Sequence, residues 1–421
     1  MSNITQFPLD ASWQKLVSRD KSQRIYDNLS NTTLVLDFDP RWRGVFAYNE
    51  MERREYLLRE IPTHVPGEVL VIPRPVTDYE NAKTLEWFHG NGLLMLRDDV
   101  VHKAINVTAM KNSFHPVKAF LEGLEWDQKP RLDDWLALAL GTPKSVYASM
   151  AGRLFLLGMV KRAMEPGCKM DYMLILEGDQ GLKKSTVTEI LAGGAHFGLA
   201  DFDNLASVEV SISLRNKWLM EFGELHTLRK SEINQLKMWL TKQVEDYRPK
   251  WGKRNVEEPR QCVFIGTTNQ SEYLNDPTGG RRFWPVKCTK IDEDWLRANR
   301  DQMMAEAMEL WRAGLLPFPE EEDEKNYFKP EQSARAMIDP WEDKLLPFVR
   351  TKDEVINSTL LAILDLRGQS VSHQNAAKIV LIMIKFGFKK SENNKGIIWK
   401  RIDPILKKKV AAKPIPTSDS V

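Results

Sequence analysis

The sequence is poor in cysteine and has no long apolar segment. Its three cysteines, Cys168, Cys262 and Cys288, are far apart. This spacing excludes a zinc-binding motif and favours buried thiols in a reducing compartment. No apolar run approaches the roughly 20 residues of a transmembrane helix, and the N-terminus lacks the apolar region of a signal peptide. These absences predict a cytoplasmic protein with no membrane partner.

The sequence also lacks a strong net charge, internal repeats and long low-complexity tracts. Its 60 Lys and Arg residues against 58 Asp and Glu residues give a formal net charge of +2, so any nucleic-acid surface must be a local patch. No repeat suggests a solenoid. The length of 421 residues predicts two or three domains.

The chain is organised around residues 173–186, MLILEGDQGLKKST. An apolar run too short for a typical helix is followed by a glycine-containing turn and a helix start. This order predicts a strand, a phosphate loop and a helix whose N-terminus favours anions. Lys184 is expected to contact the β- and γ-phosphates of ATP, and the Ser185 hydroxyl to hold Mg²⁺. The predicted ATP-binding residues are Gly178, Asp179, Gln180, Gly181, Leu182, Lys183, Lys184, Ser185 and Thr186.

Lys183 departs from the usual phosphate-loop pattern, which has glycine immediately before the Lys-Ser pair. Its side chain must either point away from the phosphates or add a second cation to them. The alternative for the whole segment is an ordinary strand-to-helix turn with solvated lysines. That alternative loses weight because the expected partners of a phosphate loop follow downstream in order.

Two acidic residues follow the next buried strand, residues 218–220. In a phosphate-loop enzyme one carboxylate binds Mg²⁺ or its waters, and a second polarises the attacking water. We assign Glu221 to the metal and Glu224 to the general base, although the spacing leaves these roles interchangeable. The alternative is a surface turn with two solvated glutamates.

Polar residues of two further kinds come next. A third buried strand, residues 261–268, leads to Asn269, which is placed to orient the water near the γ-phosphate. Arg281 and Arg282 follow paired glycines and precede aromatic residues. A rigidly mounted arginine of this kind suits an arginine finger supplied to the nucleotide of a neighbouring subunit. The alternative for either arginine is a structural salt bridge.

Residues 247–254 form a basic loop that contains aromatic residues, proline and glycine. Cations with interleaved aromatics suit a nucleic-acid backbone and stacked bases, although composition alone equally allows a solvated charged hairpin. The candidate DNA-binding residues are Arg248, Lys250, Trp251, Lys253 and Arg254.

The order of predicted elements indicates an α/β protein with several parts. Within the first part, alternation in residues 33–38 predicts a strand. Residues 341–405 show two helices and a basic two-stranded wing in winged-helix order. The predicted parts are an α+β accessory domain over 1–140, a phosphate-loop core over 141–316, a linker over 317–340, the winged-helix-like domain over 341–405 and a disordered basic tail over 406–421.

Several of these stretches together resemble the virulence-associated protein E family. The resemblance covers roughly residues 85–290. It implies an AAA+ core similar to superfamily 3 helicases, encoded by prophages and mobile islands and serving replication. The residues that carry it are 131–133, 166–172, 177–186, 218–225, 247–249, 264–269 and 280–285.

The resemblance implies roles that agree with those assigned from the residues. Lys184 and Ser185 become the phosphate and magnesium residues, and Glu221 and Glu224 the acidic pair. Asn269 becomes the first sensor. The basic loop becomes a hairpin that grips single-stranded DNA in the channel of a hexamer. The resemblance thus predicts an ATP-dependent DNA helicase or translocase, with ATP and Mg²⁺ as cofactors, in a bacterial host cell.

Two other functions stay open on the sequence alone. The winged-helix-like end allows an ATP-switched initiator or loader that binds origin DNA. Lys183 allows a catalytically idle interference ring. The expected partners are single-stranded or origin DNA, further copies of the chain in a hexameric ring, and a separate primase or replication initiator.

Overall fold

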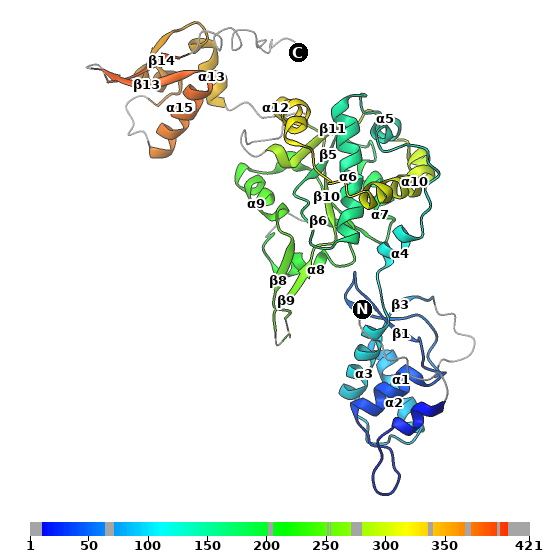
Figure 1. The fold of residues 1–421 in the computed structure, drawn as a ribbon. Helices are drawn as coiled ribbons and strands as arrows, with labels where there is room; N and C mark the ends of the chain where they lie inside the picture. The colour runs from blue at the N-terminus through cyan, green and yellow to red at the C-terminus, as the bar shows by residue number, and fades with distance from the viewer. Residues whose placement is uncertain are drawn as a thin grey trace. The chain divides into compact units, whose positions relative to one another are not determined.

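The computed structural model describes residues 11–63, 71–200, 205–250, 252, 254–270, 280–335, 340–366, 372–393 and 396–402. It shows an α/β protein that divides into two compact units, Met1–Ala336 and Met337–Val421 (Figure 1). Within the described residues, no helix is both long and apolar enough to cross a membrane. Cys262 and Cys288 are buried free thiols, and Cys168 is half-buried.

The N-terminal part of the first unit combines helices with a small mixed sheet. The sheet has the strand order β3-β2-β1-β4. The buried rings of Trp42, Phe46 and Phe88 stack in its core. The elements are η1 (Ala11–Leu16), α1 (Leu29–Phe38), β1 (Phe46–Asn49), β2 (Arg54–Leu57), β3 (Arg74–Pro75), α2 (Asp78–Gly90), α3 (Asp98–Lys111) and β4 (Ser113–Phe114).

The strand predicted for residues 33–38 is wrong, because these residues belong to helix α1. The side chain of Asn28 accepts a hydrogen bond from the N–H of Asn31 at 2.9 Å and caps the helix. The hydroxyls of Thr32 and Thr33 donate to backbone carbonyls four residues earlier. These local bonds outweigh the strand preference of the β-branched residues.

The core of the first unit is a five-stranded parallel sheet with the order β11-β5-β10-β7-β6. Strand β10 lies between β5 and β7, although it follows both in the sequence. Its carboxyl end therefore lies between the ends of the other two. The strands are β5 (Met173–Glu177), β6 (Phe197–Ala200), β7 (Leu219–Phe222), β10 (Val263–Thr268) and β11 (Phe283–Lys287).

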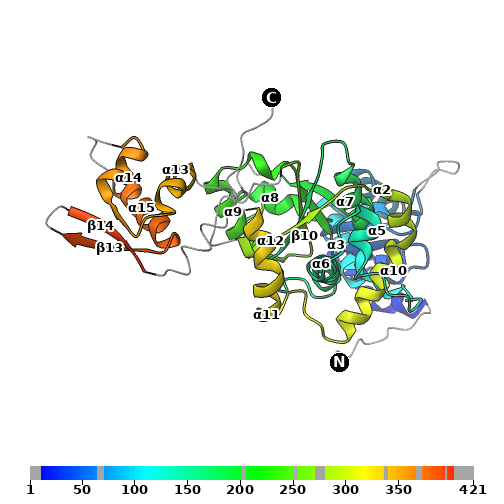
Figure 2. The same cartoon turned by 90° about the horizontal axis from the view of Figure 1, so that it is seen from above.

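Helices cover both faces of this sheet (Figures 1 and 2). Leu174 and Leu176 of β5 pack with α6, α7 and α10 in one core, whereas Met173 and Ile175 pack with α9 in the other. Burial on both faces explains the continuous apolar runs in the sequence. The elements around the sheet are α4 (Pro116–Glu122), α5 (Trp135–Leu140), α6 (Val146–Met164), α7 (Lys184–Ala192), α8 (Val208–Ser213), η2 (Leu225–Thr227), α9 (Lys230–Leu240), η3 (Gly280–Arg282) and α10 (Glu293–Arg312).

The stretch 317–340, for which the sequence predicts a linker, contains short helices. They are α11 (Glu321–Asp323), the π-helical turn η4 (Glu324–Phe328) and α12 (Lys329–Ala334). The fully buried ring of Phe328 lies 5.0 Å from that of Tyr147 and 5.3 Å from that of Trp284. These contacts hold the segment on α6 and β11, which composition alone does not indicate.

The second unit contains helices and a three-stranded antiparallel sheet with the order β12-β14-β13. Leu360, Met383 and Trp399 are buried in its core. The two predicted helices and the two predicted strands after them are present. The predicted tail 406–421 lies outside the described residues. The elements are α13 (Pro340–Val349), β12 (Glu354–Ile356), α14 (Asn357–Ile363), α15 (His373–Lys385), β13 (Phe388–Asn393) and β14 (Gly396–Arg401).

Candidate nucleotide-binding site

A glycine-containing loop, residues 178–183, connects β5 to α7. The ammonium group of Lys184 donates to the backbone carbonyls of Gly178 at 2.7 Å and Asp179 at 2.9 Å. Partial burial lowers the pKa of Lys184. Gly181 has a φ of 85°, a left-handed conformation that glycine adopts readily. Two carbonyls of the loop thus bind the amine. The predicted strand and helix on the two sides of the loop are present as β5 and α7.

Lys183 has a left-handed backbone, with φ 64° and ψ 35°. Its ammonium group lies 2.7 Å from a carboxylate oxygen of Glu293, the first residue of α10. The hydrogen bond that Lys183 donates to Glu293 raises the pKa of Lys183. Of the two alternatives for this side chain, the structure shows the first: it points to α10 and not into the loop. The backbone angle explains why the common pattern has glycine at this position.

Glu221 of β7 is 2% exposed and lies beside the start of α7. The Ser185 hydroxyl donates to its Oε1 at 2.7 Å, and the Thr267 hydroxyl of β10 donates to the same oxygen at 3.0 Å. The structure therefore brings together the two residues that the sequence assigns to the metal. Thr267 was not predicted, although its place two residues before Asn269 on a strand that ends in polar residues is a usable signal.

The second oxygen of Glu221, Oε2, is buried and has no hydrogen-bond partner among the described residues. A buried carboxylate oxygen without a partner is costly unless a cation or water satisfies it. Mg²⁺ in phosphate sites uses one or two protein oxygens and takes its other ligands from phosphates and water. Within the described part of the chain, no cluster of three His, Cys, Asp or Glu could hold a metal alone. Ser185 and Glu221 thus fit Mg²⁺ that arrives with a nucleotide.

Glu224 and Asn269 extend from neighbouring strands at the same edge of the sheet. Phe222, the last residue of β7, pairs with Gly266 of β10, so the chain beyond both strands emerges beside the glycine-containing loop. Both side chains are exposed. Glu224 has a left-handed φ of 51°, which turns the chain sharply directly after β7.

Arg281 and Arg282 lie at the opposite edge of the sheet from the glycine-containing loop of their own chain. They directly precede Phe283, which pairs with Met173 at the start of β5. The five residues of β5 separate this edge from the loop by roughly 15 Å. Arg281 is exposed and Arg282 is half-buried. The structure does not bring these arginines to the loop of the same chain.

The turn that carries the two arginines is fixed by α12. The Gln332 amide, which is 7% exposed, donates to the backbone carbonyls of Arg281 at 3.3 Å and Phe283 at 3.2 Å. The Nε of Arg282 is buried and has no hydrogen-bond partner among the described residues. Gln332 thus holds the backbone of the turn, while the predicted role of the two arginine side chains stays a prediction.

The basic loop joins two short antiparallel strands, β8 (Val244–Tyr247) and β9 (Val256–Pro259). Figure 1 shows this hairpin projecting from the sheet. Arg248, Lys250 and Arg254 are exposed, and the Nε of Arg248 donates to the carbonyl of Gly252 at 2.9 Å. Trp251 and Lys253 lie outside the described residues.

Arg335 was missed by sequence reasoning. Its Nε lies 2.9 Å from Oε1 of Glu177, and its Nη2 lies 3.0 Å from Oε2 of the same carboxylate. Glu177 is the residue directly before the glycine-containing loop. Burial opposes the charge of Arg335, but hydrogen bonds to Glu177 and Glu331 raise its pKa. No local signal reveals a contact between residues so far apart in the chain.

Replacement of this arginine tests the contact. We expect Arg335→Gln to lower the free energy of unfolding of the first unit by about 2–3 kcal/mol, because it removes the charged partner of a nearly buried carboxylate. Urea unfolding of the full chain, followed by tryptophan fluorescence, measures the change. Arg54→Gln is the control, since the Arg54–Glu52 pair is 3.4 Å long and more exposed. Equal midpoints for the two variants would contradict the prediction.

The fold and the site define an α/β protein whose parallel sheet carries a glycine-containing loop, a buried acid and a mounted arginine pair. The sequence profile described as the virulence-associated protein E-like domain matches residues 121–337, slightly more than half of the 421-residue chain. The chain therefore belongs to this family, and the predicted resemblance is confirmed.

Comparisons with solved structures and with curated proteins say less about this chain than the family match does. The chain is similar to two apo structures of the NrS-1 C-terminal region, with 14% identity and a TM-score of 0.42 for the A form, and 15% and 0.44 for the other. Each match covers 85% of this chain and 96% of the other. TM-scores this low support no conclusion about the chain. No curated protein matches it.

Proposed function

We propose that this chain is an AAA+ phosphate-loop ATPase that acts as a DNA helicase or translocase in the replication of a phage or mobile genetic element. One observation carries the proposal: the Ser185 hydroxyl lies 2.7 Å from the buried Glu221 carboxylate, and the preceding residue, Lys184, places its amine on the carbonyls of the loop. A nucleoside triphosphate with its metal requires a hydroxyl, an acid and an amine at the end of a glycine-containing loop.

The order of the strands supports the proposed site. Strand β10, which leads to Asn269, lies between β5, which leads to the loop, and β7, which carries Glu221. Because all three strands are parallel, the chain that follows β10 at Asn269 emerges between the loop and the acids. This position suits an amide that orients the attacking water.

The proposed roles follow from these positions. Residues 178–186 would bind the phosphates through backbone N–H groups, and Lys184 would contact the β- and γ-phosphates. Ser185 and Glu221 would hold Mg²⁺, which neutralises charge on the phosphate oxygens. Glu224, exposed at the same edge, would orient the attacking water and accept its proton. Asn269 would hold that water from the other side.

A neighbouring subunit would complete the site. Arg281 and Arg282 precede the strand whose first residue, Phe283, pairs with the start of β5, so they lie at the opposite edge of the sheet from their own loop. An arginine finger supplied in trans accounts for a mounted, exposed arginine at that edge. We therefore propose a ring, hexameric by analogy with superfamily 3 helicases, with ATP bound between subunits.

The hairpin and the second unit would contact DNA. The exposed Arg248, Lys250 and Arg254 suit phosphates of single-stranded DNA. In the second unit, Lys389 of β13 stands directly opposite Lys400 of β14. Lys400 already has a carboxylate oxygen of Glu354 at 3.8 Å, whereas Lys389 is exposed and suits a phosphate. The two lysines lie on strands that follow two helices, which is the helix-helix-wing order. This arrangement also favours a second candidate function, an ATP-switched initiator that binds origin DNA.

Steady-state ATP hydrolysis with and without single-stranded DNA tests the proposal. We expect DNA to stimulate turnover, and Glu224→Gln to reduce it about 100-fold while ATP still binds, because the general base is lost. Glu189→Gln on the exposed side of α7 is the matched control and should leave turnover unchanged. A wild-type chain that binds ATP without turnover would favour the initiator or an idle ring. If the wild-type chain bound no ATP, the proposed function would be contradicted.

A further inference from the structure

Two buried glutamates face each other at the base of the hairpin. In the register of β8 and β9, Glu245 stands directly opposite Glu258. They are 2% and 6% exposed. Like charges directly opposite in an antiparallel pair are destabilising, and buried carboxylates must be paired with cations. The conformation of the hairpin base therefore depends on the cations around these two acids.

Glu245 is neutralised by residues that flank the hairpin or lie close to it. The Arg260 Nε lies 2.6 Å from its Oε1, and the Lys242 ammonium lies 2.6 Å from its Oε2. The Ser211 hydroxyl donates to Oε2 at 2.8 Å. Burial alone would raise the pKa of Glu245, but Arg260 and the hydrogen bonds hold it below its usual value. Arg260 itself stacks on Trp239 at 4.0 Å.

Glu258 is neutralised from outside the hairpin. Arg215, in the segment between α8 and β7, places Nη2 2.6 Å from Oε1 and Nε 3.2 Å from Oε2. The Tyr247 hydroxyl donates to Oε1 at 2.9 Å. Arg53, in the turn between β1 and β2, places Nη1 3.4 Å from the same oxygen. The Glu258 carboxylate thus connects the hairpin with the segment before β7 and with the N-terminal sheet.

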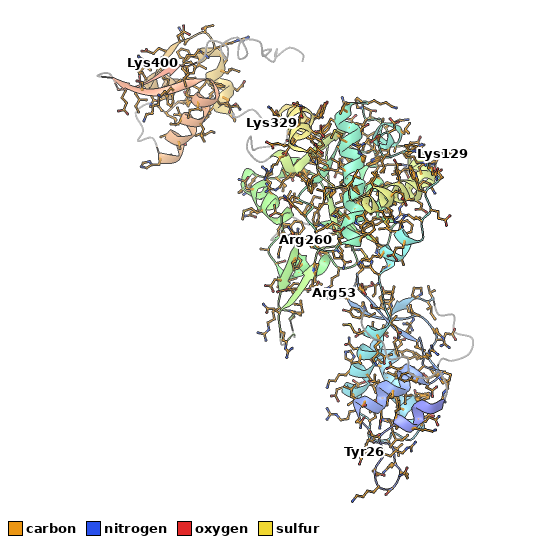
Figure 3. The ribbon with its side chains drawn as sticks, viewed as in Figure 1. Tyr26, Arg53, Lys129, Arg260, Lys329 and Lys400 are labelled. Carbon is orange, nitrogen blue, oxygen red and sulfur yellow. The ribbon has the colours of Figure 1, made fainter. Side chains whose placement is uncertain are left out.

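Other contacts hold the N-terminal turn at this place. The N–H of Asn216 donates to the carbonyl of Met51 at 2.8 Å. A ring nitrogen of His115, which is 6% exposed, lies 2.8 Å from the amide oxygen of Gln261. Figure 3 marks Arg53 and Arg260, which lie on the two sides of this junction. A cavity of about 30 Å³ separates the turn from the hairpin base, which is room for a single water.

We infer that Arg53 is a positioning residue for the β8–β9 hairpin, which we propose contacts DNA. By adding a cation to Glu258, the N-terminal sheet fixes the direction in which β8 and β9 leave the core. That direction sets where Arg248, Lys250 and Arg254 meet the DNA backbone. The inference rests on the proposed function for its DNA part, and it gives the N-terminal sheet a role in DNA engagement.

A DNA titration of ATP turnover tests this role. In Arg53→Gln we expect the concentration of single-stranded DNA that gives half-maximal stimulation to rise about five- to tenfold, because the hairpin cations are less well placed. Turnover without DNA should stay at the wild-type rate, since Arg53 is remote from the phosphate loop. Arg53→Lys should restore most of the DNA response. Arg54→Gln, next in the chain, should behave as wild type, because among the described residues Arg54 forms an ion pair only with nearby Glu52, at 3.4 Å.

Hydrogen exchange of the β8 and β9 amides gives a second readout that needs neither ATP nor DNA. It should be several-fold faster in Arg53→Gln than in wild type or Arg54→Gln. Unchanged exchange, or an unchanged DNA titration in a chain that DNA stimulates, would overturn the inference alone. A wild-type chain without DNA-stimulated turnover would overturn the proposed function and the DNA part of the inference together. The exchange rates would still decide whether Arg53 holds the hairpin.

Discussion

ATP turnover is expected to fall by about 100-fold or more in the Lys184→Ala variant. The Lys184 amine is held by two loop carbonyls, at 2.7 and 2.9 Å, so it already lies where phosphates would bind. In the proposed site, its charge would be the main cation that the chain itself offers to the β- and γ-phosphates. Phosphate release at saturating single-stranded DNA measures the loss, and the binding of a fluorescent ATP analogue shows whether affinity falls with it.

The adjacent lysine provides a matched control for this experiment. Lys183 carries the same charge, but its ammonium group lies 2.7 Å from Glu293. Lys183→Ala should therefore stay within about threefold of wild-type turnover, since an exposed ion pair contributes little. Lys183→Gly should also stabilise the loop by about 1 kcal/mol, because glycine adopts the left-handed backbone without strain. Equal losses of turnover in both alanine variants would show that the two lysines share the phosphates, and would contradict the assigned difference.

The local parts of the candidate site could be predicted from the sequence. The short apolar run, the glycine turn and the Lys-Ser pair define the loop within one segment. The buried strand before Glu221 identifies the acid that the Ser185 hydroxyl contacts. Parallel strands share one edge at their carboxyl ends, so polar residues after successive strands converge there. This physical rule needs only the order of the strands along the chain.

The non-local parts could not be predicted in this way. Arg335 binds Glu177 from 158 residues away, and Arg53 reaches Glu258 from a different sheet. Such ion pairs depend on how separate elements pack, which hydrophobic periodicity does not encode. The direction of the Lys183 side chain was open for the same reason, because it depends on where α10 begins. The helix at residues 29–38 was missed because a cap at Asn28 outweighed strand propensity.

A loss of about 1000-fold in ATP turnover is expected for Arg281→Ala, with a smaller loss for Arg282→Ala. Arg281 is exposed, whereas Arg282 is half-buried, so in the proposed ring the first would extend more readily to a neighbouring subunit. Gln332 holds the backbone carbonyls of Arg281 and Phe283, on either side of Arg282. Nucleotide binding should survive in Arg281→Ala, because the phosphate loop of the same chain is intact. A variant that loses binding and turnover together would place Arg281 in its own site, contrary to the strand register.

Mixing two inactive variants separates an arginine acting in trans from one acting in its own subunit. Arg281→Ala keeps its loop and lacks the finger, whereas Lys184→Ala keeps the finger and lacks the loop cation. In a ring assembled from equal amounts of both, about a quarter of the interfaces pair an intact loop with an intact finger. Turnover should therefore recover to about a quarter of the wild-type rate after the subunits are mixed and reassembled. A finger that served its own subunit would leave every site defective, and the mixture would stay inactive.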